Sequence, residues 1–453
     1  QNAFDIPLRD PLWKHVYLTR AFQKLIHARP FLRLGQIRQL SSATLVYPGS
    51  RHTRFEHSIG VFWMARRVLL ALLCSKYSEV SGFEPTLHGV KAFLAAALLH
   101  DIGHFPYAHI LEGLETEHEE ISARYILSEP LAPIILHELG TDPRLVAALV
   151  DETLPIPAEY RPEGLLYRSL LSGTLDPDKM DYLNRDAYYC GVPYGIQDLE
   201  YLLSEVHLCR LDDTAPLDSG KSPFCIGVPE RGVTIIESLI FSRYLMYRTV
   251  YWHRNVRALS APVKEGTARA LELGLIRQEQ IFDSNDQSFP ALFEGLDLPE
   301  RELCLLAQEP RRFVVVDELC LGRVLAQVQD GNTRVYLDGL QQRGQKQELC
   351  LSLYAYLQQR YGWPSLQVWQ VMLDLTGPKK MLIRDIYVSQ AMQPMDGRQR
   401  SLLPFSQSST VLQPNTLDDF LKSLTMLRLI LPVEYAPPKQ DKPLNDFLEL
   451  HLL

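Results

Sequence analysis

The sequence lacks the marks of a disulfide-stapled, zinc-ribbon or membrane-spanning protein. Its seven cysteines are scattered and odd in number, and no CxxC spacing occurs, which is typical of reduced cytosolic thiols. Apolar runs such as Ala92–Leu99 are far shorter than the ~20 residues of a membrane span. The opening segment QNAFDIPLRD lacks the basic-then-apolar pattern of a secretion signal. We therefore expect a cytoplasmic protein that does not contact a membrane.

An excess of basic residues is lacking as well. Lysine and arginine number 46 against 54 aspartate and glutamate residues, which gives a net charge of −8. Nucleic acid is therefore not expected as a partner, although an assembled oligomer could still form a basic groove. The 453 residues are 46% hydrophobic and 22% charged, a composition that excludes a disordered chain and supplies a large core.

Helical periodicity dominates the first 270 residues. Asp176-Pro177 is a favourable helix start, because Asp suits the N-cap and Pro the first helical position. Apolar spacing predicts further helices at 57–73, 90–100, 118–127 and 235–258. The polar stretch 211–223 is expected to be a surface loop.

The pattern changes after about residue 275. The segment DSNDQSFP (283–290) has the composition of a linker. Strands are predicted at 312–317, 333–337, 381–389 and 426–435, and helices at 345–361 and 416–424. We therefore expect a mainly α protein, with an all-helical core over 1–270 and a smaller mixed α+β lobe over 271–453.

The strongest chemical signal is His100-Asp101 within ALLHDIGH. Adjacent helix residues point about 100° apart, so both can flank one bound ion. An apolar helix that suddenly presents His100, Asp101 and His104 needs a partner to offset their desolvation, and a metal cation is one such partner.

Two further ligand candidates are His57, in RHTRFEHSIG, and Asp178, in LDPDKMDYLNRD. Each is expected near the start of a helix. Two imidazoles and two carboxylates suit one divalent ion (Mn, Mg, Fe or Zn) and leave coordination positions for water and phosphate oxygen.

The order His57 … His100-Asp101 … Asp178 resembles the H…HD…D signature of the HD-domain metal phosphohydrolases. Longer segments resemble the deoxynucleoside triphosphate (dNTP) triphosphohydrolases, including the catalytic core of the vertebrate enzyme that joins a SAM to an HD domain. These segments are QLSSATLVYPGSRHTRFEHSIG (39–60), HDIGHFPYAH (100–109) and LDPDKMDYLNRDAYYCGVPYG (175–195). The last contains CGVPYG, which is similar to the bacterial branch. The resemblance covers roughly residues 5–260.

The resemblance implies roles at matching positions. The metal would be held by His57, His100, Asp101 and Asp178, the triphosphate by Arg54, Lys179 and Arg243, and the deoxyribose by Gln39, Tyr182, Asp186 and Tyr251. Gln39 and Asp186 would bind its 3′-hydroxyl, and a tight floor under Tyr251 would reject a 2′-hydroxyl. The catalytic cluster would be His104, His109, Glu112 and His118, with His109 as general acid and Glu112 where the family usually has Asp.

Residue types and spacing agree with part of this assignment. Arginine suits bidentate contacts to phosphate. Asp178, Tyr182 and Asp186 are spaced i, i+4, i+8 and share a helix face. Plain alternatives stay open: the tyrosines can be ordinary core residues, Arg243 can form a surface salt bridge, and His118 can be a polar helix start.

The chain also departs from the family's GTP-regulated members. The positions that match their guanine-reading Asp, Gln and Arg are His27, Leu32 and Gly35. None of these offers the required donors and acceptors, so we expect no GTP activation of that form.

The resemblance therefore implies an enzyme that hydrolyses dNTPs to deoxynucleoside and inorganic triphosphate, by water attack on the α-phosphorus. It also implies a homo-oligomer, a dimer or a tetramer. One alternative is an HD-type nucleotidase or phosphodiesterase acting on another nucleotide. Others are a nucleic-acid-binding protein with a relict metal site and a dinuclear oxygenase using His104 and nearby histidines.

Overall fold

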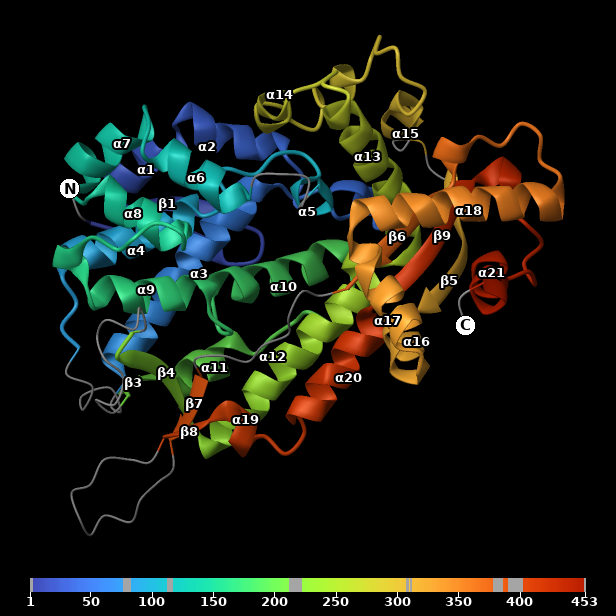
Figure 1. Cartoon of the computed structure of the whole chain (residues 1–453). Helices are drawn as coiled ribbons and strands as arrows, with labels where there is room; N and C mark the ends of the chain where they lie inside the picture. Colours follow the sequence, from blue (N-terminus) through green and yellow to red (C-terminus); the bar gives the residue numbers. More distant parts are fainter. Residues whose placement is uncertain are drawn as a thin grey trace.

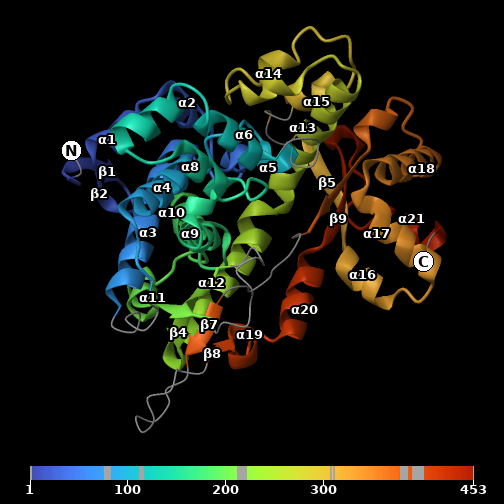
Figure 2. The ribbon, with the colours of Figure 1, turned by 60° about the vertical axis from the view of Figure 1, so that its left-hand side comes forward.

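A computed structural model describes residues 3–75, 83–111, 117–211, 222–306, 309, 312–377, 386–389 and 402–451. A helical body and a smaller α+β lobe lie side by side and are joined along the long helix α13 (Arg254–Glu272). Figures 1 and 2 show both parts from different sides. The mainly α fold class expected from the sequence is confirmed.

The helical body is built around α3 (Arg54–Cys74), which packs against α4 and α10. Its other helices are α1 (Arg20–Ile26), α2 (Arg29–Arg33), α4 (Leu87–Leu99), α5 (Ala108–Leu111), α6 (His118–Ile126), α7 (Leu131–Pro133), α8 (Pro143–Val150), α9 (Glu163–Ser172), α10 (Pro177–Cys190), α11 (Leu199–Glu205) and α12 (Val233–Met246). The predicted helices at 57–73, 90–100 and 118–127 are thus confirmed as α3, α4 and α6.

Helix α10 begins as the sequence predicts. The Asp176 side chain accepts a hydrogen bond from the Lys179 amide, and Pro177 occupies the first turn. The helix ends at Gly191, whose left-handed backbone (φ 68°, ψ 34°) favours glycine. These caps fix where α10 enters and leaves the body, and so fix the direction of its polar face.

Two small sheets flank the helices. Strands β1 (Ile6–Asp10) and β2 (Lys14–Leu18) form an antiparallel hairpin. Strands β3 (His207–Arg210), β4 (Phe224–Pro229), β7 (Ile386–Ser389) and β8 (Leu402–Pro404) form a four-stranded sheet in the order β3-β4-β7-β8. The β4–β7 pair is parallel and brings the carboxy-terminal part of the chain back onto the body.

The prediction of one helix over 235–258 is wrong. Helix α12 passes into a π-helix at Tyr247–Tyr251, and α13 starts anew at Arg254. The break has a local cause: the His253 side chain caps α13 by accepting from the Asn255 amide. A π-helical turn of this kind re-aims the side chains that it carries.

The α+β lobe is built on the antiparallel sheet β5-β9-β6. Its strands are β5 (Phe313–Cys320), β6 (Met372–Thr376) and β9 (Met426–Pro432), and its helices are α16 (Leu321–Gln327), α17 (Gly331–Asp338), α18 (Arg343–Tyr361) and α21 (Pro443–His451). Further helices are α14 (Gln278–Phe282), α15 (Arg301–Leu306), α19 (Phe405–Ser408) and α20 (Pro414–Leu424). The predicted strands at 312–317 and 426–435 and helices at 345–361 and 416–424 are present.

Three expectations for this half turn out differently. The predicted strand 333–337 is wrong: these residues lie in α17, whose start is capped by Asp330. Of the predicted strand 381–389, only β7 lies within the described residues. Most of the expected loop 211–223 also lies outside them. The boundary between 1–270 and 271–453 stays a prediction, although α13 runs across it.

By length and composition α3 could cross a membrane, which the apolar runs alone did not predict. However, 61% of its apolar window is buried inside the protein. A buried core helix gives the same values, and α3 packs against α4 and α10.

Candidate metal and substrate site

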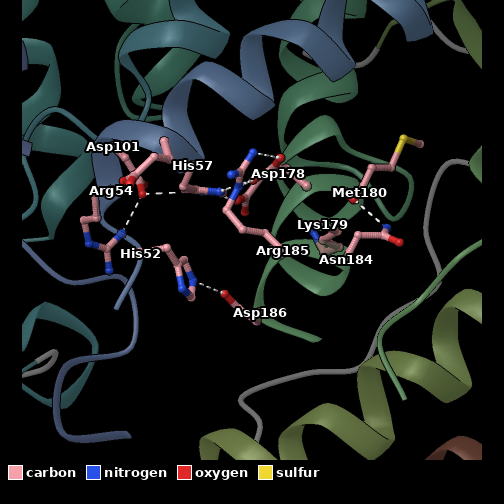
Figure 3. A network of polar contacts seen from close by, with 12 residues as sticks. His52, Arg54, His57, Asp101, Asp178, Lys179, Met180, Asn184, Arg185 and Asp186 are labelled. Atoms are coloured by element: carbon pink, nitrogen blue, oxygen red, sulfur yellow. Dashed lines mark hydrogen bonds and ion pairs between the residues drawn. The ribbon is translucent and has the colours of Figure 1, made fainter. Parts of the chain in front are cut away.

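Three elements bring the predicted metal ligands together (Figure 3). His57 comes from the first turn of α3, Asp101 follows α4, and Asp178 lies in the first turn of α10. The Nε2 atom of His57 lies 3.0 Å from Asp178 Oδ1 and 3.6 Å from Asp101 Oδ2. The Nε2 atom of His100 lies 3.2 Å from Asp101 Oδ1 and 3.7 Å from Asp178 Oδ1. All four ligand candidates therefore point at one place.

The donor set fits a divalent cation. His57, His100 and Asp101 can offer ligand atoms within 4.8 Å of one another. The buried Nε2 of His100 faces the carboxylates of Asp101 and Asp178 but forms no hydrogen bond of normal geometry with any described residue. Burial lowers the pKa of His57, but the carboxylates of Asp178 and Asp181 outweigh it and raise that pKa to about 10. A bound cation would replace the protons that these imidazoles otherwise hold.

Asp181 is a site residue that the sequence reasoning missed. Its Oδ2 lies 2.9 Å from Nδ1 of His57, the ring nitrogen opposite the metal-facing one. Arg185 in turn donates to both Asp181 oxygens, at 2.8 and 3.0 Å. Asp181 stands three residues after Asp178 and shares its helix face, and this spacing was the signal in the sequence that could have revealed it.

The three predicted phosphate-binding residues differ in the contacts that they make. Arg54 is buried and donates to Asp101 at 2.5 Å, so its guanidinium is already paired with one of the predicted metal ligands. Lys179 Nζ contacts Asp176 and lies 3.1 Å from the Gly173 carbonyl. Arg243 lies over the Tyr247 ring, 5.7 Å from its centroid, and its buried Nε has no hydrogen-bond partner among the described residues.

The predicted sugar-binding residues gather around Asp186 on α10. Tyr251 donates to one Asp186 oxygen at 2.7 Å, and His52 Nε2 lies 2.7 Å from the other. The Tyr182 and Tyr251 rings meet edge to face, with centroids 6.1 Å apart. The backbone N–H of Gln39 donates to the His52 carbonyl, and its buried side-chain Oε1 has no hydrogen-bond partner among the described residues.

His52 is the second residue that the sequence reasoning missed. It is buried and stacks on Tyr189, with ring centroids 4.5 Å apart. No residue spacing links it to Asp186, because the two stand 134 residues apart. Its place directly inside RHTRFEH was the only signal in the sequence.

The histidines of the predicted catalytic cluster also meet. The ring centroid of His104 lies 3.9 Å from that of His118 and 5.0 Å from that of His109. His104 Nδ1 lies 3.2 Å from Asp101 Oδ1, which joins this cluster to the metal ligands. Burial, followed by the Arg54 charge, holds the pKa of His104 well below its usual value. Glu112 lies outside the described residues.

The positions compared with the GTP-reading residues lie on the surface. His27, Leu32 and Gly35 are all exposed. The absence of GTP activation stays a prediction.

Residues 54–183 match the HD domain, and residues 225–301 match the HD associated region. The uncharacterized protein YwfO of Bacillus subtilis is 33% identical over 290 residues, 63% of this chain and 60% of YwfO. The deoxynucleoside triphosphate triphosphohydrolase SAMHD1 of Danio rerio is 26% identical over 290 residues, 58% of this chain and 44% of that protein.

A hypothetical protein from Aquifex aeolicus has the same fold, with a TM-score of 0.64 and 24% identity over 95% of this chain and 97% of that chain. The chain spans only 50–60% of the length of the first curated relatives it matches. With its motif order and its helical core, the chain belongs to the HD-domain phosphohydrolases.

Proposed function

We propose that this phosphohydrolase converts dNTPs to deoxynucleosides and inorganic triphosphate. The observation that carries the proposal is the polar face of α10. It places the ligand candidate Asp178, the ring of Tyr182 and the carboxylate of Asp186 along one line. The relationship to a protein named as a dNTP triphosphohydrolase supports the same substrate class.

The metal end of this line would bind phosphate. His57, His100, Asp101 and Asp178 would hold one divalent ion, which when bound would polarise a phosphoryl oxygen and lower the pKa of water. Lys179 directly follows Asp178, so its ammonium can serve a phosphate near that end. The charge of Arg243 acts on Tyr182 and opposes the rise in its pKa, so the two side chains are near each other. The Nε of Arg243, which has no hydrogen-bond partner within the described part of the chain, can donate to a phosphate oxygen.

The other end would bind the sugar. Asp178 and Asp186 are eight residues apart, about 12 Å along a helix. Asp186 is fixed by Tyr251 and His52, so its carboxylate is oriented before any ligand arrives. In this arrangement Asp186 and Gln39 would bind the 3′-hydroxyl, and Tyr251 would leave no room for a 2′-hydroxyl.

The cluster of His104, His109 and His118 would transfer protons during the reaction. Water attack on the α-phosphorus forms a new P–O bond and breaks the bond to the 5′-oxygen, which must gain a proton as it leaves. His109 is exposed and lies beside buried His104. We assign it the role of general acid, because imidazole exchanges protons near neutral pH. His104 and His118 would position it.

The proposal is tested by incubating the protein with each dNTP, singly and mixed, with Mn²⁺, and separating the products by ion-pair chromatography. Deoxynucleoside and triphosphate in equal amounts are expected, with ribonucleotides left intact. Mixed pools matter because one dNTP can activate cleavage of another. Intact substrates with Mn, Mg, Fe and Co would refute the proposal, and release of orthophosphate or pyrophosphate would favour another HD-type nucleotidase. A homo-oligomer in the cytoplasm belongs to the same proposal.

A further inference from the structure

A buried chain of alternating charges runs from the amino-terminal hairpin to the metal cluster. Asp10, at the end of β1, accepts from Arg185 Nη1 at 2.9 Å. Arg185 donates through its other two nitrogens to Asp181, and Asp181 contacts His57 Nδ1. Every link of this chain is nearly fully buried, with at most 2% of any of the four side chains exposed.

The hairpin holds its end of the chain firmly. Asp10 Oδ1 accepts from the amides of Leu12 and Trp13, at 2.8 and 2.7 Å, and so closes the turn between β1 and β2. The indole Nε1 of Trp13 also donates to Asp181. The hairpin therefore contacts Asp181 twice, through Arg185 and directly.

The neighbouring helix leaves room for this chain at one position. A Cβ atom at Gly60 of α3 would stand 1.9 Å from Asp181 Oδ1 and 2.5 Å from Arg185 Nη2. Asp181 and Arg185 are each held by further hydrogen bonds, so moving either side chain would cost free energy. Any larger side chain at this position would displace the carboxylate that faces His57.

We propose that Asp10 and Trp13 of the hairpin are positioning residues of the metal centre, acting through Arg185 and Asp181 on His57. The hairpin lies outside the segment that matches the HD domain, yet the geometry makes it part of that centre. This inference rests on the metal of the proposed function and is independent of which nucleotide is hydrolysed.

The physical reason is the choice of nitrogen in His57. A carboxylate at Nδ1 keeps the proton on that nitrogen and leaves the Nε2 lone pair free for a metal. Asp181 can do this only if its own orientation is fixed, and Arg185 and Trp13 fix it. If Arg185 or Trp13 no longer holds Asp181, its carboxylate can rotate. His57 then binds the metal more weakly, although none of the metal ligands has been changed.

The test measures metal affinity rather than turnover alone. The chelator-stripped full chain is titrated with Mn²⁺, and free Mn²⁺ is followed by its electron paramagnetic resonance signal. We expect Asp181→Asn to raise the dissociation constant about 10- to 100-fold. Asp10→Asn and Trp13→Phe should raise it by less, in the same direction.

The two hairpin variants are chosen to fold. Asn at position 10 can still accept from the turn amides, but it presents no charge to Arg185. Phe at position 13 keeps the ring and loses only the N–H group. Asp5→Asn is the matched control, because Asp5 is exposed at the start of the same hairpin, and it should bind Mn²⁺ as the wild type does.

A second readout separates positioning from general damage. If the hairpin acts through the metal, kcat of the two variants falls at limiting Mn²⁺ and recovers at saturating Mn²⁺. Folded Asp10→Asn and Trp13→Phe proteins that keep the wild-type dissociation constant would overturn the inference. If the Asp10→Asn protein does not fold, the Mn²⁺ dissociation constant of the Trp13→Phe protein alone tests the inference. A wild-type chain that binds no Mn²⁺ would instead contradict the proposed metal site itself.

Discussion

At the residue scale, the metal ligands depend on one another. His100 and Asp101 share the cluster with His57 and Asp178, and removing one leaves the others poorly satisfied. We therefore expect His100→Ala and Asp101→Ala to lose bound metal and turnover together, measured by elemental analysis and product formation. Full turnover in either variant would show that the metal assignment is wrong.

Lys179 is predicted to act on the substrate and not on the metal. In the Lys179→Ala protein the metal content should stay at the wild-type level, while KM for a dNTP rises. The loss of one charge-assisted hydrogen bond, about 1.5–3 kcal/mol, corresponds to roughly a 10- to 100-fold rise. Lys24→Ala, which removes an exposed lysine paired with Glu138, is the control. Unchanged KM and kcat would remove Lys179 from the site.

Asp186 is predicted to recognise the 3′-hydroxyl. Wild-type enzyme should prefer a dNTP to its 2′,3′-dideoxy analogue, because the analogue lacks the hydroxyl that would donate a hydrogen bond to the Asp186 carboxylate. Asp186→Asn should reduce that preference by about tenfold or more, measured as a ratio of kcat/KM values. If the ratio is the same in both proteins, the sugar lies elsewhere.

The sequence could predict the site residues that stand in recognisable motifs. His57, His100, Asp101 and Asp178 were found from their order, and the structure brings them together. His52 was missed because spacing does not encode its contact with Asp186, and Asp181 because its spacing from Asp178 does not reveal its contact with His57. His52 reaches Asp186 across 134 residues, and Asp181 matters only because His57 turns its Nδ1 toward it.

At the scale of elements, a buried ion-pair group ties the lobe to the helical body. Asp374 of β6 accepts from Arg257 of α13 at 2.9 and 2.6 Å and lies 3.7 Å from Arg428 of β9. Arg428 also donates to the carbonyl of Trp252, next to the π-helix that carries Tyr251. The lobe thus contacts the segment next to Tyr251, one of the proposed sugar-binding residues.

Breaking this group should be costly. Asp374→Asn leaves the largely buried guanidinium of Arg257 without its charge partner and leaves Arg428 paired only with Glu318, so we expect a loss of about 3–5 kcal/mol in the free energy of unfolding. Asp419→Asn, which removes an exposed partner of Lys422, should change it by less than about 1 kcal/mol. Chemical denaturation measures both, and equal losses would contradict the assignment.

The pH dependence of this contribution has a definite sign. Burial raises the pKa of Asp374, but Arg257 and Arg428 outweigh it and hold the pKa below the usual value. The stabilisation is therefore complete above the unfolded-state pKa of about 3.9 and is lost as pH falls toward the lower folded-state pKa. The difference in stability between wild type and Asp374→Asn should shrink in that acid range.

Elements were predictable where local signals agree. Helix α10 has its cap, its proline and its glycine in the sequence. Residues 333–337 have strand-forming side chains, but the Asp330 cap and the packing of Leu337 in the lobe core favour a helix. The break between α12 and α13 was missed, because no glycine or proline marks it in the sequence.

At the scale of the whole molecule, part of the carboxy-terminal half of the chain packs back onto the helical body. Strand β7 pairs with β4, and Phe405 and Leu412 pack in the core of the helical body. A sequence read in order suggests two successive parts, because pairing between distant strands leaves no local trace. The activity we propose uses residues from the helical body and a sugar pocket that the lobe supports.

The central claim is that water attacks the α-phosphorus of a dNTP. Hydrolysis in ¹⁸O-labelled water, followed by mass spectrometry of all products, tests it most directly. The account predicts one ¹⁸O atom in inorganic triphosphate and none in the deoxynucleoside. Label in the deoxynucleoside, in orthophosphate or in pyrophosphate would contradict it, and so would the absence of any labelled product.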